Sequence, residues 1–181
     1  NLLAHYLLNG NGVDSGGDHH DGIVIGTDTV EDRAGAFGSA VSLGEGDSVR
    51  VPSSLNLWEP SWTVALWLKP QPFTSQTVAD VLHYYIPPGS TVTSDVNVHL
   101  QLADGGAAVG AQGPGWQVAS QSVLALNTWN HVAVTYDIEA VRMYVNGELV
   151  LETPERFGKS GAAVNYMVST DVDQPQQHPY Y

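Results

Sequence analysis

Two stretches of the chain alternate between apolar and polar residues with a period of two, and this pattern constrains the fold more than any other feature. They are residues 62–70, Trp-Thr-Val-Ala-Leu-Trp-Leu-Lys-Pro, and residues 128–150, which begin Thr-Trp-Asn-His-Val-Ala-Val-Thr-Tyr. In the second stretch Val132 and Val134 point to one side, and His131 points to the other. Successive side chains of a β-strand point to opposite faces of its sheet, so each stretch predicts a strand with one face on a core.

The second stretch continues into a pair of alternating runs, residues 141–145 and 148–152, which are separated only by Asn146 and Gly147. Asn and Gly both accept a positive φ, as the two-residue turn of a β-hairpin requires. This part of the chain is therefore predicted to be antiparallel β-structure.

Short apolar runs separated by turn-forming residues make up the rest of the chain. Further strands are expected at residues 2–8, 23–26, 40–43, 48–51, 78–86, 96–102, 107–111, 117–120 and 164–169, with a hairpin turn at 44–47. No segment shows a sustained helical period, and no internal repeat appears. About twelve short strands in one domain, residues 1–181, predict an all-β, two-sheet antiparallel sandwich.

The charge balance is strongly acidic, with 19 Asp and Glu against 6 Lys and Arg and a formal net charge of −13. This excludes the basic surface that binding to nucleic acid or to an anionic membrane needs. No apolar run approaches the ~20 residues that span a bilayer, so membrane insertion is not expected. Cations and neutral ligands remain as partners.

The chain contains no cysteine. Disulfides, zinc–thiolate sites and cysteine catalysis are therefore excluded, and a bacterial or archaeal source is favoured over a secreted eukaryotic one. The sequence starts at Asn1 inside an apolar–polar pattern, without a Met or a signal peptide. We interpret it as a processed or excised piece of a longer protein.

A series of short motifs precedes the alternating stretches. They are Leu3-Ala4-His5-Tyr6, Asn9-Gly10-Asn11, Asp14-Ser15-Gly16, Asp21-Gly22, Asp32-Arg33, Gly38-Ser39-Ala40 and residues 49–52. In this order they resemble the opening of bacterial laminin-G-like domains of the concanavalin A-like superfamily, and the alternating stretches match the same family. The resemblance covers residues 2–152 and implies a jelly roll of two antiparallel sheets. It further implies a secreted or cell-surface binding module, often for carbohydrate and often with a calcium ion.

The chain departs from this family pattern near its C-terminus. Laminin-G-like domains close with a strand of the type Ile-Asp-Asp/Glu-Val-Arg-Ile-Tyr, and no such segment follows Tyr166. The turn after Asp137 also lacks the usual Gly. Three explanations stay open: the closing strand is absent, the C-terminus is built differently, or another chain supplies the strand.

The loop at residues 9–22 is the best candidate for a metal site. Calcium prefers six to eight oxygen ligands on a flexible loop. The candidate ligands here are Asn11, Asp14, Asp18 and Asp21. The alternative is a solvated loop in which the carboxylates cap backbone amides. Zinc or copper at His19 and His20 is a weaker alternative, because no third ligand has a suitable spacing.

Residues 45–50, Glu-Gly-Asp-Ser-Val-Arg, come close to a catalytic motif. Glycosidases of this superfamily carry Glu-x-Asp-x-x-Glu on one strand, whereas this chain has Arg50 at the last position. Retaining hydrolysis needs two carboxyl groups about 5 Å apart. We therefore expect the chain not to be an enzyme.

The aromatic residues divide into two predicted groups. Trp62, Trp67 and Trp129 lie within alternating strands and are predicted to be core residues. Those near Pro or Gly turns are candidate sugar contacts: Trp58, Tyr84, Tyr85 and Trp116. An exposed aromatic ring can stack on the apolar face of a sugar, and the alternative is that these rings pack beneath long loops.

The sequence favours a non-catalytic binding or adhesion module that is extracellular or at the cell surface, with a carbohydrate or surface glycan as ligand and calcium as structural ion. The first alternative is a structural or assembly domain of a surface protein or filament that a neighbouring chain completes, with other protein chains or copies of itself as partners. The second alternative is a glycosidase or lyase of the same superfamily.

Overall fold

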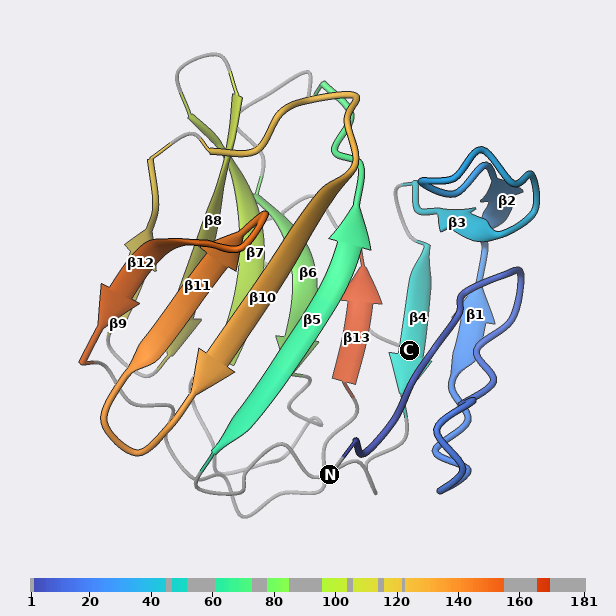
Figure 1. The fold of residues 1–181 in the computed structure, drawn as a ribbon, viewed down its shortest axis with the longest axis horizontal. Helices are drawn as coiled ribbons and strands as arrows, with labels where there is room; N and C mark the ends of the chain where they lie inside the picture. The colour runs from blue at the N-terminus through green and yellow to red at the C-terminus, as the bar shows by residue number, and fades with distance from the viewer. Residues whose placement is uncertain are drawn as a thin grey trace, which may run out of the picture. The chain divides into compact units, whose positions relative to one another are not determined.

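The computed structural model describes residues 2–44, 47–51, 61–72, 78–84, 96–103, 106–113, 116–121, 123–154 and 166–169. All regular elements of this part of the chain are β-strands (Figure 1). They are β1 Ile23–Ile25, β2 Asp28–Val30, β3 Ala40–Ser42, β4 Ser48–Val51, β5 Trp62–Leu68, β6 Val78–Tyr84, β7 Val96–Ala103, β8 Gly106–Gly113, β9 Trp116–Ala119, β10 Asn130–Tyr136, β11 Val141–Val145, β12 Glu148–Thr153 and β13 Tyr166–Ser169. Among the described residues, no helix has the length and apolar character needed to cross a membrane.

The chain divides into two compact units, each made of more than one segment. The first unit consists of Asn1–Asn56, Ala79–Thr91 and Ala162–Tyr181. The second unit consists of Leu57–Val78 and Val92–Gly161.

The second unit contains a four-stranded antiparallel sheet in the order β12-β11-β10-β5. Val134 of β10 pairs with Val64 of β5 and with Met143 of β11. Burial alternates along β10 and β11, so that Val132, Val134, Val141, Met143 and Val145 are buried. The alternation predicted from the sequence is therefore confirmed, and it gives this sheet one core-facing side and one solvent-facing side.

The predicted hairpin joins β11 to β12. Asn146 and Gly147 have φ values of +52° and +90°, as a turn with two left-handed residues requires. The register shifts between Met143 and Tyr144, so that Tyr144 pairs with Leu149. A β-bulge of this kind adds local twist to an edge of the sheet.

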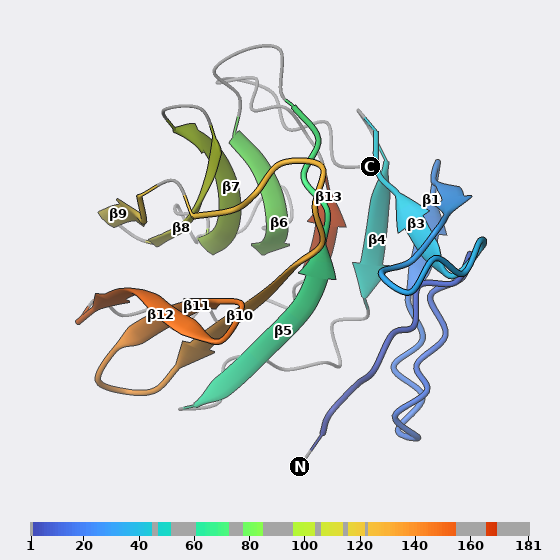
Figure 2. The same ribbon diagram turned by 45° about the horizontal axis from the view of Figure 1, so that its top comes forward.

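A further antiparallel ladder in the same unit runs from β7 through β8 to β9. It lies behind the four-stranded sheet in Figure 1, and the turned view of Figure 2 shows the same two layers. Ala107, Ala108 and Val109 of β8 are fully buried, and the backbone of Ala107 is hydrogen-bonded to that of Leu124. The described core of the second unit includes these residues together with the buried valines and Met143.

The first unit contains the strands β1, β4, β13 and β6 in that order. β4 pairs antiparallel with β1 on one side and with β13 on the other. β13 also pairs with β6, through Tyr166 with Tyr84 and Met167 with His83. Residues 166–169 are thus hydrogen-bonded on both sides, and the chain itself supplies the strand at this position.

One predicted strand and one predicted strand pairing in the first unit are wrong. Residues 2–8 form only an isolated bridge, between Tyr6 and Asp14. Leu8 has a φ of +54°, which interrupts any extended run, and the amide of His5 donates to the Asp14 side chain. The predicted hairpin between β3 and β4 is not formed either, because β3 pairs with β2.

Candidate functional site

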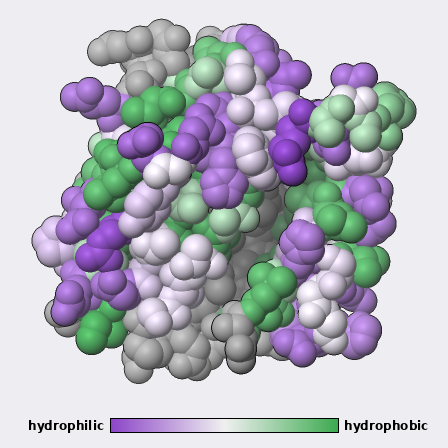
Figure 3. All heavy atoms as spheres, viewed as in Figure 1, coloured by the Kyte–Doolittle hydropathy of each residue, from purple (hydrophilic) through white to green (hydrophobic). Residues whose placement is uncertain are grey.

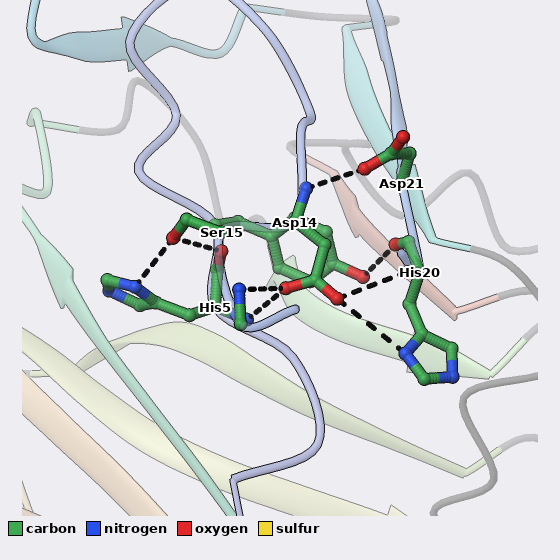
Figure 4. Close-up of polar contacts among 7 residues, drawn as sticks. His5, Asp14, Ser15, His20 and Asp21 are labelled. Atoms are coloured by element: carbon green, nitrogen blue, oxygen red, sulfur yellow. Dashed lines mark hydrogen bonds and ion pairs between the residues drawn. The ribbon is translucent and has the colours of Figure 1, made fainter. Parts of the chain in front are cut away.

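The buried carboxylate of Asp14 organises the N-terminal loop (Figure 4). Its Oδ1 accepts the amide protons of His5 at 2.8 Å and Gly16 at 2.7 Å. Its Oδ2 accepts the amide proton of His20 at 3.1 Å and lies 3.6 Å from the ring Nδ1 of the same residue. One side chain therefore connects three points of the loop that are up to 15 positions apart in the sequence.

Neighbouring side chains close the loop around this carboxylate. Asp21 Oδ1 accepts the amide proton of Asp14 at 2.9 Å. The Tyr6 hydroxyl donates to the carbonyl of His20 at 2.5 Å, and the Ser15 hydroxyl donates to the carbonyl of His5 at 2.9 Å. We refer to His5, Tyr6, Asp14, Ser15, His20 and Asp21 as the Asp14 cluster.

The protonation of the Asp14 cluster follows from these contacts. The amide donors of His5 and Gly16 hold the pKa of Asp14 at about 2, below its usual 3.8. Burial, with the nearby carboxylates of Asp14 and Asp21, raises the pKa of Tyr6 to about 12. At neutral pH the cluster therefore contains an ionised Asp14 and a neutral tyrosine that donates its proton.

Two glycines permit the close packing of the loop. The amide of Gly22 donates to the carbonyl of Gly12 at 2.7 Å. A Cβ at Gly12 would lie 2.5 Å from the carbonyl oxygen of Gly22, and a Cβ at Gly22 would lie 2.7 Å from that of Arg50. Only residues without a side chain fit at these two positions.

The described contacts do not fit the predicted role of Asp14 as a calcium ligand. Both lone pairs of Oδ1 accept amide protons, and Oδ2 accepts a third. Asn11 Oδ1 accepts the amide proton of Val13, while Asp18 and Asp21 are exposed. Among the described residues, no group of three or more His, Asp or Glu side chains could hold a metal ion. Calcium at this loop stays a prediction from the sequence.

The second unit presents a different candidate site, on the solvent-facing side of its four-stranded sheet. Trp67 lies there with 47% of its surface exposed, opposite His131 on the neighbouring strand. The two ring centroids are 5.1 Å apart and the planes are inclined by 56°. We call this side of the sheet the Trp67 face.

The strand register arranges the Trp67 face in three rows. Trp67 and His131 form the first row, and Ala65 pairs with Ala133 in the second. The second row continues through Tyr144 to Leu149, and the third contains Thr63, Thr135, Arg142 and Glu152. Figure 3 shows residues of near-neutral hydropathy, drawn white, along β10 and β5 in the same view as Figure 1.

The prediction that Trp67 belongs to the core is wrong. Trp62 and Trp67 are five positions apart, so the period of two places them on opposite sides of β5. Trp62 lies on the core-facing side, with its ring centroid 5.8 Å from that of its cross-strand partner Tyr136. Trp129 is half-buried, just before β10 begins. The parity of these positions was the sequence signal that could have identified Trp67 as an exposed residue.

The described part of the structure does not include the side chains of the four aromatic residues predicted to contact sugar. Trp58 and Tyr85 lie outside the described residues. Tyr84 is the last residue of β6 in the first unit, and Trp116 is the first residue of β9 in the second. Their role as ligand contacts stays a prediction.

The segment that resembles a glycosidase motif forms a turn before β4. Asp47 Oδ2 accepts the amide proton of Gly44 at 2.7 Å, and the Asp47 amide donates to the Gly44 carbonyl at 3.1 Å. Glu45 lies outside the described residues, and Arg50 is in β4. Asp47 is thus used as a turn residue.

Residues 43–174 match the family model of the concanavalin A-like lectin/glucanases superfamily (Laminin_G_3). The chain belongs to this family. Its laminin-G-like resemblance and its all-β, antiparallel jelly-roll class are thereby confirmed. No curated protein matches the chain.

Several solved structures share the fold of this laminin-G-like chain at low sequence identity. Domain 4 of AbnA, an extracellular GH43 arabinanase from Geobacillus stearothermophilus solved with arabinotriose, is 20% identical with a TM-score of 0.68. The match covers 96% of this chain and 85% of that domain. Botulinum neurotoxin type C has 14% identity and a TM-score of 0.63, and the match covers 99% of this chain and 44% of the toxin chain. That structure comes from work on the dependence of its cell entry on two ganglioside molecules. Alginate lyase A1-II′ has 16% identity and a TM-score of 0.51, and the match covers 80% of this chain and 73% of the lyase chain.

Proposed function

We propose that this laminin-G-like chain is a non-catalytic carbohydrate-binding module of an extracellular or cell-surface protein. The observation that carries the proposal is the exposed indole of Trp67, held against His131 on a regular antiparallel sheet. A large aromatic side chain that is half exposed on a strand loses contact with the core, and such exposure is typical of a binding surface. The family and the fold neighbour solved with arabinotriose support carbohydrate as the ligand class.

The absence of catalysis in this proposal rests on the sequence around Asp47. The position of the second catalytic carboxylate in the superfamily's glycosidase motif is occupied by Arg50, and Asp47 is engaged in the turn with Gly44. A retaining glycosidase needs a second carboxyl group at this site. Turnover of polysaccharides by this chain is therefore not expected.

Two measurements on the 181-residue chain test the proposal. Affinity gel electrophoresis on a panel of soluble polysaccharides should show retardation by at least one of them. A reducing-sugar assay on the same panel, which includes laminarin, arabinan and alginate, should show no products. Turnover that is lost in Glu45→Gln would establish an enzyme instead, and a chain that binds none of the panel would contradict the proposal.

A role in assembly is the second candidate, favoured by exposed apolar side chains of the first unit. Leu2, Leu7, Ile23 and Phe37 expose between 57% and 79% of their surface. Exposed large apolar side chains are a feature of surfaces that contact other proteins. Light scattering after size exclusion distinguishes this role, because a monomer at high concentration argues against self-assembly.

A further inference from the structure

The Trp67 face combines an exposed aromatic ring with a row of small, uncharged side chains in the register beside it. Ala65 and Ala133 pair in the row next to Trp67 and His131, and both have the smallest side chain that a strand can carry besides glycine. Cross-strand neighbours are about 5 Å apart and successive rows about 7 Å. We call this alanine pair the alanine floor.

Larger side chains border the alanine floor in three directions. Trp67 and His131 form the row on one side, and Thr63 and Thr135 form the row on the other. Tyr144 of the neighbouring strand β11 pairs with Ala133 on the third side. A ligand on the floor would therefore meet one or two aromatic faces and a row of hydroxyl groups.

The backbone beneath this arrangement is fixed. His131 is held by Asn146, whose Oδ1 accepts its amide proton at 2.9 Å and whose own amide donates to its carbonyl at 2.8 Å. The His131 ring in turn contacts the Trp67 indole. Binding on a pre-organised surface loses little side-chain entropy, which favours the recognition of a weakly interacting ligand.

The charges on the Trp67 face exclude one class of saccharide. Arg142, in the threonine row, donates to Asp137 Oδ2 at 2.6 Å and to Glu152 Oε2 at 3.0 Å, so two carboxylates compensate its charge. The chain as a whole has a net charge of −13. A polyanionic sugar chain would be repelled, whereas a neutral one would not.

We infer that the Trp67 face binds a neutral saccharide chain, with one sugar ring stacked on Trp67 and the next ring over the alanine floor, directed towards Tyr144. This inference rests on the proposed function and names its ligand class and its binding surface. The apolar side of a sugar ring matches the exposed indole, and its hydroxyl groups match the ring nitrogens of His131 and the Thr63 and Thr135 hydroxyls.

The test measures the affinity of the full chain for linear arabinan, mixed-linkage β-glucan and galactomannan as neutral probes, and for alginate and polygalacturonate as anionic probes. Trp67→Ala should weaken binding to the neutral probe by at least about tenfold. Ala65→Gln, which places a long side chain on the floor and leaves Trp67 in place, should weaken it similarly. Phe37→Ala is the matched control, because Phe37 is 79% exposed and lies in the other unit. It should leave the affinity unchanged.

Each other outcome has a separate meaning. Binding of a neutral probe that survives both Trp67→Ala and Ala65→Gln overturns this surface and leaves the proposed function standing. Selective binding of alginate or polygalacturonate overturns the neutral ligand class. A wild-type chain that binds no probe overturns both the surface and the proposed function. A Trp67→Ala variant that changes from oligomer to monomer in light scattering shows a protein contact instead and overturns the inference.

Discussion

Asn146 and His131 are joined by two hydrogen bonds, one from each backbone amide. The amide of His131 donates to Asn146 Oδ1 at 2.9 Å, and the amide of Asn146 donates to the His131 carbonyl at 2.8 Å. Asn146 is also the first left-handed residue of the β11–β12 turn, with a φ of +52°. Asn146 therefore forms half of the two-residue turn and also fixes the start of β10 beside Trp67.

Substitutions of Asn146 separate its two roles. Asn146→Gly keeps a residue suited to positive φ and loses only the side-chain bonds, so we expect a destabilisation of about 1 kcal/mol. Asn146→Ala also introduces left-handed strain and should cost about 2 kcal/mol in total. Urea denaturation measures both values. Equal stability of the two variants would show that the turn conformation contributes nothing.

Replacement of Asp14 should alter the acid stability of the protein. The folded-state pKa of about 2 lies below the usual 3.8, so the ionised carboxylate stabilises the fold above about pH 4, and this contribution is lost as the pH falls to 2. Asp14→Asn should lower the melting temperature at pH 7 by several degrees and by little at pH 2. Asp18→Asn, at an exposed position, is the control and should follow the wild type at both pH values. A constant difference between Asp14→Asn and wild type across this range would contradict the assignment.

Tyr6 should account for part of the loss of folding stability at alkaline pH. Its pKa of about 12 in the folded state is above the 10.0 of a free tyrosine, so its contribution is complete below pH 10 and is lost between pH 10 and 12. Tyr6→Phe removes the bond to the His20 carbonyl and should make the loss of stability over this range shallower. Melting temperatures from pH 8 to 12 measure it. Parallel curves for the variant and the wild type would count against a buried, neutral Tyr6.

Gly12→Ala should destabilise the first unit by about 1–3 kcal/mol or more, because the new Cβ would lie 2.5 Å from the backbone carbonyl oxygen of Gly22. Gly44→Ala is the matched control. Of the residues that the structure describes, its Cβ would meet only the Asp47 carboxylate, at 3.3 Å, and that side chain can move. Chemical denaturation of both variants tests the difference, and a Gly12→Ala variant as stable as Gly44→Ala would contradict the close approach of the two backbones.

Calcium at the N-terminal loop can be tested without any assumption about the ligand set. Because Asp14 is satisfied by backbone amides, its contribution to stability should not change between EDTA and millimolar calcium. We therefore expect Asp14→Asn to lower the melting temperature by the same amount in EDTA and in millimolar calcium, and a larger effect in calcium would contradict this expectation. A calcium-dependent increase in the melting temperature of the wild type would show binding to the folded state. If Asp18→Asn abolished that increase, the exposed carboxylates would be the ligands.

The strands of the second unit were predictable because their side chains alternate without interruption. The burial of Val132 and Val134 and the turn at Asn146 follow from local patterns of two to seven residues. The exposure of Trp67 follows from the same pattern, because its odd spacing from Trp62 places it on the other face of β5. A Trp on a strand is as exposed as its face of the sheet, whatever its hydrophobicity.

The first unit was less predictable because its contacts are made by side chains and by distant segments. Residues 2–8 alternate as a strand does, yet the amide of His5 is taken by the Asp14 carboxylate instead of a neighbouring strand. The partner of β3 is β2, although β4 is nearer in the sequence and follows directly after the turn at Asp47. No local propensity distinguishes a carboxylate that caps three amides from one that binds a cation.

The position of β13 has a consequence for how the protein is made. This strand lies between β4 and β6, both of which leave the ribosome long before residues 166–169 are translated. During synthesis the facing edges of β4 and β6 stay open, and open edges are the sites where nascent chains associate with each other or with chaperones. The sheet of the first unit can close between β4 and β6 only after β13 has emerged, so its folding is governed by long-range pairing.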